Sequence, residues 1–286
     1  MNGVAASAAE ANKGHLAVVT GASSGIGAAI ARVLAARGLS ILAIARRSDR
    51  LEALGSEIQT ACSGRVYPLV LDLTAADAVD RIEREIQRIG APLCWLVNNA
   101  GVGRYARFEE VGWRTWSQDL RLMNSLPMEL THRLLPRLRQ AVPAYVLNVA
   151  SVASYTPGIP GTPLYAAVKS SLLRFTEALS GELRGSGVTF TASCPGFTDT
   201  EIFEAGGLSD AQTQGYRRGQ TFMSADQVAE EAVAAALRGD MSIIHGLSSR
   251  LAVFLFRHMP QAWARRQMAA TLPPAPAPPR TTVAGD

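Results

Sequence analysis

Tyr165 and Lys169 are the two residues of this sequence whose types and spacing best suit proton transfer. They lie four positions apart in a stretch with helical periodicity, so both side chains should share one helix face. The pKa of a tyrosine is ordinarily about 10, and a neighbouring ammonium group should lower it towards neutrality. An amphipathic helix with a surface lysine is the alternative. Because only Lys13 and Lys169 occur among 286 residues, chance seldom gives this spacing, and we predict an acid/base pair.

A glycine-rich segment near the start of the chain suits phosphate binding. Residues 20–27 read TGASSGIG and stand between an apolar run and an alanine-rich helical pattern. Gly21 permits a tight turn, while Gly25 and Gly27 allow the backbone to approach a pyrophosphate and the helix to pack on the strand. The N–H groups and the dipole at the start of that helix favour a phosphate. An ordinary strand–helix turn is the alternative, but the flanking strand and helix favour a nucleotide-binding loop.

The elements that must position these residues are short apolar runs that alternate with helical patterns. Strands are expected at Leu16–Thr20, Ile41–Ala45, Val66–Leu71, Leu93–Asn98, Tyr145–Ala150, Val188–Ser193 and Ser242–His245. Helices are expected at Gly25–Arg37, Arg50–Cys62, Asp77–Ile89 and Leu164–Leu183, among others. Nearly continuous apolar runs are typical of parallel strands buried on both faces. We therefore predict an α/β protein, a single-domain Rossmann fold with a doubly wound parallel sheet of about seven strands and helices on both faces.

One domain is expected over residues 14–246, without an internal boundary. The first 13 residues are small and polar, and Pro273–Thr282 is rich in proline and alanine. The tails at 1–13 and 271–286 are therefore predicted to be disordered. Residues 247–270 are predicted to form an apolar helical extension between the domain and the second tail.

Composition excludes several classes of protein. Hydrophobic residues make up 48% and charged residues 18% of the chain, which is enough for a large core. No apolar run approaches the roughly 20 residues that span a bilayer, and the first 15 residues lack the pattern of a secretion signal. Three scattered cysteines, Cys62, Cys94 and Cys194, form no CxxC pair. We expect a cytoplasmic protein with reduced thiols and no zinc site.

Charges and histidines give no sign of a nucleic-acid or metal site. The formal net charge is +4, but the arginines are scattered along the helical segments, so no nucleic-acid partner is expected. The histidines His15, His132, His245 and His258 are dispersed without metal-ligand spacing, so no metal site is expected. Cys194 is interpreted as a buried small residue, and Asp199 and Glu201 as solvated loop charges.

Further motifs, in this order along the chain, resemble those of the short-chain dehydrogenase/reductase family. They are the TGxxxGxG loop at 20–27, Asp72, the NNAG sequence at 98–101, Asn124, Ser151, the YxxxK sequence at 165–169 and the PGxxxT sequence at 195–200. The resemblance spans residues 15 to about 245. It implies a Rossmann-fold oxidoreductase that interconverts a carbonyl and an alcohol by hydride transfer with a nicotinamide cofactor.

The resemblance also implies roles for individual residues. Tyr165 would be the acid/base, Ser151 would hold the substrate oxygen, Lys169 would bind the nicotinamide ribose, and Asn124 would hold a water of a proton relay. The cofactor-binding residues it implies are Gly21, Ser23, Ser24, Gly25, Ile26, Gly27, Arg46, Arg47, Asp72, Leu73, Asn99, Ala100, Gly101, Tyr165, Lys169, Pro195, Gly196, Thr198 and Thr200. Asp72 matches the contact to the adenine ring.

The end of the second expected strand distinguishes the two nicotinamide cofactors. NAD-preferring members of the family carry an acid there for the ribose 2′-hydroxyl, but this chain has Arg46 followed by Arg47. An arginine suits a 2′-phosphate, whereas a surface arginine without this role is the alternative. Many NADP-dependent relatives also carry a basic residue inside the glycine loop, where this chain has Ser23 and Ser24. We predict NADP(H) rather than NAD(H).

The expected substrate pocket has few fixed charges. It should be formed by Gly103–Tyr105, Val152–Pro163 and the segment from Phe197 to Phe222, with a lid over Thr200–Thr221. Its apolar side chains would include Tyr155, Ile159, Phe203 and Phe222. We therefore expect an apolar or bulky carbonyl or alcohol. The alternatives are a membrane-surface reductase of lipid, acyl or steroid carbonyls, and a catalytically silent NADP-binding sensor, which the intact catalytic residues disfavour.

The apolar extension has two interpretations. Residues 251–256 are continuously apolar, arginines stand at 250, 257, 265 and 266, and Trp263 follows. A helix packed on its own or a partner subunit, in a homodimer or homotetramer, is the favoured interpretation. The other is peripheral contact of 247–268 with the inner membrane face, with aromatics inserted and arginines at the headgroups.

Overall fold

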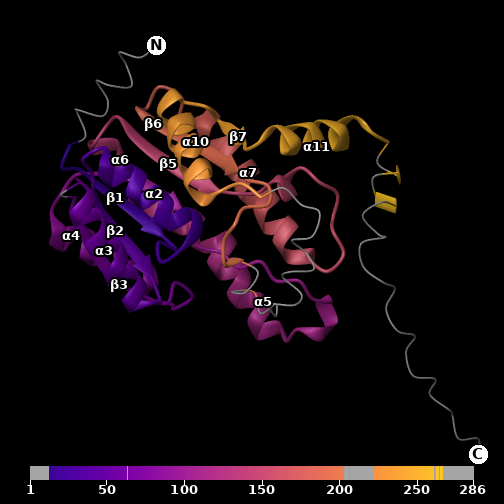
Figure 1. The fold of residues 1–286 in the computed structure, drawn as a ribbon, viewed down its shortest axis with the longest axis horizontal. Helices are drawn as coiled ribbons and strands as arrows, with labels where there is room; N and C mark the ends of the chain where they lie inside the picture. Colours follow the sequence, from indigo (N-terminus) through magenta and orange to yellow (C-terminus); the bar gives the residue numbers. More distant parts are fainter. Residues whose placement is uncertain are drawn as a thin grey trace, which may run out of the picture.

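A sheet of seven parallel strands organises the molecule. The computed structural model describes residues 13–62, 64–202, 206, 222–260, 262–263 and 265–266. The strands are β1 (Leu16–Thr20), β2 (Ser40–Ala45), β3 (Val66–Val70), β4 (Leu93–Asn98), β5 (Ala144–Val149), β6 (Val188–Cys194) and β7 (Ser242–Ile244). Their order is β3-β2-β1-β4-β5-β6-β7, with every neighbouring pair parallel (Figure 1). The predicted Rossmann architecture is confirmed, and the strand order reverses between β1 and β4, where ligands of such sheets bind.

Helices cover both faces of this sheet. One layer consists of α2 (Gly25–Ala36), α3 (Ser48–Cys62) and α10 (Ala225–Arg238); the other consists of α4 (Ala78–Ile89), α6 (Leu126–Gln140) and α7 (Pro163–Glu182). Successive residues of a strand point to opposite faces. Ala17 and Val19 of β1 accordingly pack with the first layer, and Leu16 and Val18 with the second.

Element boundaries agree closely with the sequence. Each strand ends within one residue of its predicted range, and the largest shift among the four predicted helices is the start of α3, two residues earlier at Ser48. The sequence pattern did not delimit α5 (Trp113–Leu120), α6 or α10. Pro136 lies inside α6 and interrupts the helical pattern, whereas Pro127 at its start is compatible with a first turn.

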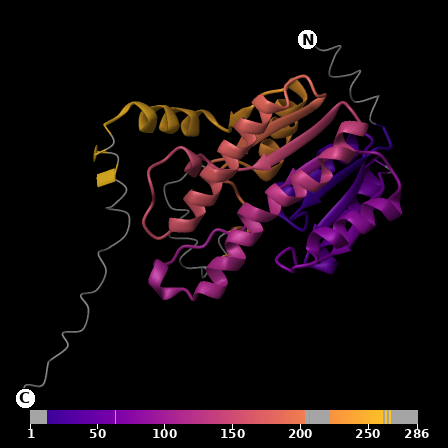
Figure 2. The same cartoon turned by 180° about the vertical axis from the view of Figure 1, so that it is seen from behind.

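Helix α11 (Leu247–His258) follows β7 and lies within the predicted extension at 247–270. The chain turns into it at Gly246, whose φ of 77° favours glycine. The helix reaches outward beyond the end of the sheet in both views (Figures 1 and 2). No helix of the described part of the chain is long and apolar enough to cross a bilayer. The tails predicted to be disordered lie outside the described residues, apart from Lys13.

Candidate active site

The carboxyl ends of the first six strands open into one cavity of about 1780 Å³. Among the residues that line it are Gly21, Ser23, Ser24, Gly25, Ile26, Arg46, Arg47, Asp72, Leu73, Asn99, Ala100, Gly101, Ser151, Tyr165, Lys169, Pro195, Gly196, Thr198 and Thr200. Of the predicted site residues, Gly27 and Asn124 do not line it. The structure thus brings the glycine loop and the Tyr165–Lys169 pair into one space.

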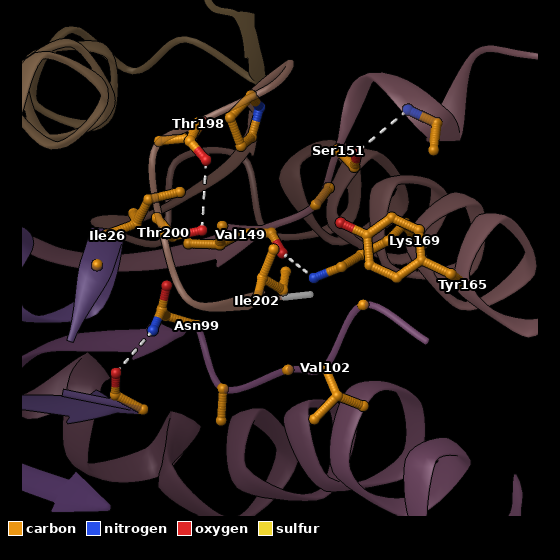
Figure 3. A pocket seen from close by; sticks show the side chains of 18 of the residues that line it. Ile26, Asn99, Val102, Val149, Ser151, Tyr165, Lys169, Thr198, Thr200 and Ile202 are labelled. Carbon is orange, nitrogen blue, oxygen red and sulfur yellow. Dashed lines mark hydrogen bonds between the residues drawn. The ribbon is translucent and has the colours of Figure 1, made fainter. Parts of the chain in front are cut away.

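Short contacts between β1 and β4 fix the glycine loop. The Thr20 hydroxyl accepts hydrogen bonds from the N–H groups of Asn99 (3.0 Å) and Ala100 (3.2 Å). The Asn99 side-chain amide in turn donates to the carbonyl oxygens of Thr20 (3.0 Å) and Gly21 (3.1 Å; Figure 3). A Cβ on Gly27 would lie 2.3 Å from both the Asn99 amide nitrogen and the Gly21 oxygen. Gly27 is therefore needed for close packing of the loop and does not reach the cavity surface.

The start of α2 is prepared for an anion. Gly21 and Gly25 have φ values of 68° and 55°, which place the loop backbone around the first turn of the helix. The Ser24 side chain makes no capping bond to α2. Backbone N–H groups at such a helix start suit a phosphate. The glycines and this helix end therefore fit a dinucleotide pyrophosphate.

Arg47 reaches from the end of β2 into the glycine loop. Its guanidinium donates to the hydroxyls of Ser23 (3.0 Å) and Ser24 (2.8 Å). It also donates to the Glu201 carboxylate (2.7 Å), which pairs with Arg50 as well (3.2 Å). The hydrogen bond from Arg47 is the main reason why the pKa of Glu201 is lowered. Glu201 is a partly exposed loop charge, as predicted, and it also pairs with two arginines at the cavity edge, which the sequence did not predict.

Asp72 is fixed at the end of β3. Its carboxylate accepts hydrogen bonds from the backbone N–H (2.9 Å) and the hydroxyl (2.8 Å) of Thr74. These bonds, opposed by burial and assisted by Arg46, lower the pKa of Asp72. Asp72 and Leu73 thus form a rigid rim of the cavity on the same side as Arg46.

Ser151, Tyr165 and Lys169 come together where β5 and α7 meet. Ser151 caps the short helix η3 (Val152–Ser154) and accepts a hydrogen bond from the Ala153 N–H at 3.2 Å. The Lys169 ammonium nitrogen donates to the Val149 carbonyl oxygen at 2.7 Å and lies 5.7 Å from the centre of the Tyr165 ring. Figure 3 shows these side chains gathered at one side of the cavity. Both Ser151 and Lys169 are buried.

Burial dominates the ionisation of this group. It raises the pKa of Tyr165, and hydrogen bonding with Ser151 only partly opposes that rise. It also lowers the pKa of Lys169 to about 8. The prediction that Lys169 would lower the pKa of Tyr165 was wrong in direction, because burial of the phenol outweighs the hydrogen bond with Ser151, which is the contribution that opposes it. At neutral pH the phenol is therefore protonated and can donate a proton.

Asn124 lies behind the cavity wall. It belongs to a π-helical turn, η2 (Arg121–Ser125), that joins α5 to α6. Its side-chain oxygen is buried without a hydrogen-bond partner in the described part of the chain. Such turns are frequent at functional sites, and a buried acceptor of this kind can hold a relay water.

Two aromatic residues predicted to line the substrate pocket do not line the cavity. Tyr155 packs against Cys194, and Phe222 against Phe197, which does line the cavity. Phe203 and residues 207–221 of the predicted lid lie outside the described residues. Apolar lining comes from Val102, Ile159, Phe197 and Ile202, in addition to α11.

The expectation of few fixed charges also needs correction. Arg104 and Asp119 both line the cavity and form an ion pair at 2.8 Å. Arg104 also donates to the Gly206 carbonyl oxygen at 3.0 Å, and its guanidinium carbon lies 5.9 Å from the ring centre of Trp116. The pair is mutually neutralised and held by these contacts. Its spacing of 15 residues gave no local signal in the sequence.

The sequence did not predict the wall of the cavity that α11 forms. Helix α11 contributes Ser248, Ser249, Ala252, Val253 and Phe256 to the lining. Its first turn packs against the Pro195–Gly196 loop so closely that a Cβ on Gly196 would meet the Ser249 hydroxyl at 2.4 Å. The lining residues recur at helical spacing, but the sequence does not say which helix face meets the domain.

The other singled-out residues give no second site. Cys194 is fully buried, which confirms its interpretation as a buried small residue, and burial raises the pKa of its thiol to about 12. His245 bonds to Ser193 at 2.9 Å and to Glu231 at 2.8 Å in the interior. No group of three or more potential metal ligands occurs among the described residues.

Known proteins share this sequence and fold. The family model for short chain dehydrogenases matches residues 15–208. A short chain dehydrogenase of Pseudocercospora fijiensis is 34% identical over 66% of this chain, which spans only 62% of that relative's length. Serine 3-dehydrogenase of Agrobacterium fabrum is 32% identical over 74% of this chain and 84% of its own. The solved structure of a short-chain dehydrogenase from Sphingobium yanoikuyae in complex with NADPH has a TM-score of 0.74 at 26% identity, covering 93% of this chain and 99% of its own. The chain therefore belongs to the short-chain dehydrogenase/reductase family, whose members act on CH–OH groups with NAD(P).

Proposed function

We propose that this protein is an NADP(H)-dependent oxidoreductase that interconverts an apolar or bulky carbonyl and its alcohol, with Tyr165 as acid/base. One observation carries the proposal. A single cavity contains both the anion-ready start of α2 and the buried Ser151, Tyr165 and Lys169 group. A sensor that only bound the nucleotide would not need that second group.

The residues present fit a nicotinamide dinucleotide. The glycine loop and the start of α2 would hold the pyrophosphate, Asp72 and Leu73 the adenine, and Asn99 to Gly101 the adjoining ribose and chain. Lys169 and the Pro195–Gly196 loop would hold the nicotinamide end. When bound, the nicotinamide supplies or accepts the hydride.

The chain's own residues supply the proton. Tyr165 donates its phenolic proton to the substrate oxygen as a carbonyl is reduced, and Ser151 donates a hydrogen bond to that oxygen as charge develops on it. The raised pKa of Tyr165 keeps the phenol protonated at neutral pH. The phenol is thus in the protonation state that carbonyl reduction uses, whereas alcohol oxidation uses the phenolate as base. The side-chain oxygen of Asn124 provides a buried hydrogen-bond acceptor for the water relay that returns a proton to Tyr165.

The preference for NADP(H) rests on the cations at the end of β2. Arg46 is exposed at the cavity edge. The Arg47 guanidinium binds the hydroxyls of Ser23 and Ser24 and so places a cation beside the glycine loop. A guanidinium binds a 2′-phosphate through charge-assisted hydrogen bonds. The Sphingobium yanoikuyae structure holds NADPH, which supports the same assignment here.

The substrate class follows from the lining beyond the catalytic residues. Val102, Ile159, Phe197 and Phe256 present apolar surface, while the Arg104–Asp119 pair cancels its own charge. An apolar or bulky carbonyl suits such a surface better than a phosphorylated sugar.

A screen tests the function. NADPH oxidation would be followed with ketones, aldehydes, steroid carbonyls and acyl carbonyls, and NADH would be compared on every active compound. We expect turnover of bulky apolar carbonyls with NADPH preferred. Tight NADPH binding without turnover of any compound would instead indicate the sensor, and equal use of NADH would remove the cofactor assignment.

A further inference from the structure

Helix α11 has two unlike faces. Ser248, Ser249, Ala252, Val253 and Phe256 face the cavity, and Val253 is only 3% exposed. On the other side, Leu247, Leu251, Phe254 and Leu255 expose 83%, 58%, 57% and 49% of their surface. Their spacing of four, three and one positions places them in one stripe along the helix. We call these four residues the outer stripe.

The outer stripe is not part of the active site. None of its residues lines the cavity. Ten large apolar residues are exposed in the described part of the chain, and five of them fall between Leu247 and Trp263. Scattered exposed apolar residues are ordinary, but a contiguous group of them marks an interaction surface.

The charges beside the outer stripe indicate which kind of partner it would bind. Residues 247–266 contain arginines at 250, 257, 265 and 266 and no aspartate or glutamate. Arg250 donates to the Ile244 carbonyl oxygen at 2.9 Å, and the Arg257 guanidinium lies 5.1 Å from the Tyr155 ring centre. These two arginines are seven positions apart and therefore flank the stripe on one side.

We propose that α11 docks this protein onto an anionic lipid bilayer. The outer stripe enters the boundary between headgroups and acyl chains, and the flanking arginines contact the headgroups. A twelve-residue helix is about 18 Å long, so it lies in the interface and does not span it. A second copy of this helix is disfavoured, because residues 247–266 carry no acidic side chain that could pair with the arginines of a second α11.

The position of the helix suits this partner. It reaches outward beyond the end of the sheet (Figures 1 and 2), and the outer stripe on it is exposed. Its other face is a wall of the cavity, so docking places the cavity beside the bilayer, where apolar carbonyl compounds concentrate. That consequence rests on the proposed function, whereas docking itself does not depend on it.

Vesicle flotation with the full-length chain tests the proposal. We expect binding to vesicles of phosphatidylcholine mixed with phosphatidylglycerol, weaker binding to phosphatidylcholine alone, and a loss of the difference at high salt. In a Trp113→Phe background, Trp263 is the remaining exposed tryptophan of the described residues, and its emission should shift to shorter wavelength on binding.

Matched variants locate the contact. Leu251→Asn combined with Phe254→Asn should lower vesicle binding by roughly tenfold or more, because two inserted apolar side chains are lost. Trp113→Asn, at an exposed aromatic residue outside α11, should bind as the wild type does. Arg265→Gln with Arg266→Gln should reduce only the preference for phosphatidylglycerol. Circular dichroism would establish that each variant is folded.

Three results would overturn the proposal. Wild-type protein that ignores phosphatidylglycerol vesicles would do so, as would unchanged binding by the Leu251→Asn, Phe254→Asn variant. A light-scattering mass that falls from dimer to monomer in this variant, without vesicle binding by the wild type, would assign the outer stripe to a second copy instead. Loss of NADPH turnover with vesicle binding intact would affect the proposed function alone.

Discussion

The cofactor side and the substrate side of the cavity are built in different ways. On the cofactor side, backbone groups and short side chains fix the geometry, as when Thr20 and Asn99 tie the glycine loop to β4. On the substrate side, side chains from distant segments meet, as when Arg104 pairs with Asp119 and Phe256 of α11 faces the same space. The first kind of construction depends on residue types at fixed local spacing. The second depends on how whole helices pack, so local patterns describe it poorly.

The largest effect is expected from a substitution that disrupts the close packing of the glycine loop. Gly27→Ala should destabilise the protein by about 3 kcal/mol or more and abolish nucleotide binding, because its Cβ has backbone and amide atoms at 2.3 Å. Gly55→Ala is the matched control, since its Cβ would meet Val66 at an ordinary 3.7 Å. That change, inside α3, should stabilise the protein by roughly 0.5–1 kcal/mol. Thermal unfolding of both variants checks this, and similar stabilities would contradict it.

The second effect concerns the buried charge of Lys169, which lies between the cofactor side and the substrate side of the cavity. Lys169 has a native pKa of about 8 against an ordinary 10.5. Between these values the unfolded chain binds a proton that the native chain does not, so this lysine makes stability rise with pH. Between pH 8 and 10.5 this lysine raises the free energy of unfolding by about 3 kcal/mol, and Lys169→Met should remove that rise.

Denaturant unfolding from pH 7 to 10.5 measures the difference between the two proteins. The buried thiols Cys94 and Cys194, whose pKa values are raised to about 12, make stability fall with rising pH in both proteins. Cys94 cancels in the comparison, whereas the Lys169 charge lowers the pKa of Cys194, so the contribution of Cys194 is part of the measured difference. Parallel stability curves for wild type and Lys169→Met would show that the lysine does not titrate as the structure indicates.

A third effect tests the cofactor side alone. Arg46→Asp should lower the ratio of kcat/KM for NADPH over NADH by about tenfold or more, because a charge-assisted contact becomes a repulsion. Arg88→Asp, at an exposed arginine of α4 paired with Glu85, should leave the ratio unchanged. An unaltered ratio in Arg46→Asp would remove this residue from the 2′-phosphate site.

The smallest effect tests the substrate side. Phe256→Ala should raise KM for a bulky apolar carbonyl by roughly tenfold, the cost of one lost apolar contact, without changing NADPH affinity. Phe254→Ala, two positions away on the outer stripe, should leave KM for a water-soluble carbonyl unchanged. Equal KM values for both variants would mean that α11 does not bound the substrate.

These comparisons explain what the sequence could and could not predict. The glycine loop and the Tyr165–Lys169 spacing were readable because the chemistry requires those residues at short fixed intervals. The direction of the Tyr165 pKa was not, since burial depends on the complete fold. The arginine partners of Glu201 could not be predicted, because they lie more than 150 positions away along the chain. The apolar character of 247–256 was evident, but its division into a cavity face and an outer stripe required the orientation of α11.

The central claim is that Tyr165 transfers the proton in the cavity that binds NADPH. Tyr165→Phe keeps the ring and removes only the hydroxyl group. The account predicts an NADPH dissociation constant within about twofold of the wild type and a kcat lower by roughly 10²–10⁴-fold on the best carbonyl. Fluorescence titration and steady-state kinetics on the same protein preparation measure both quantities. A kcat above a few per cent of wild type with normal NADPH binding would contradict the account.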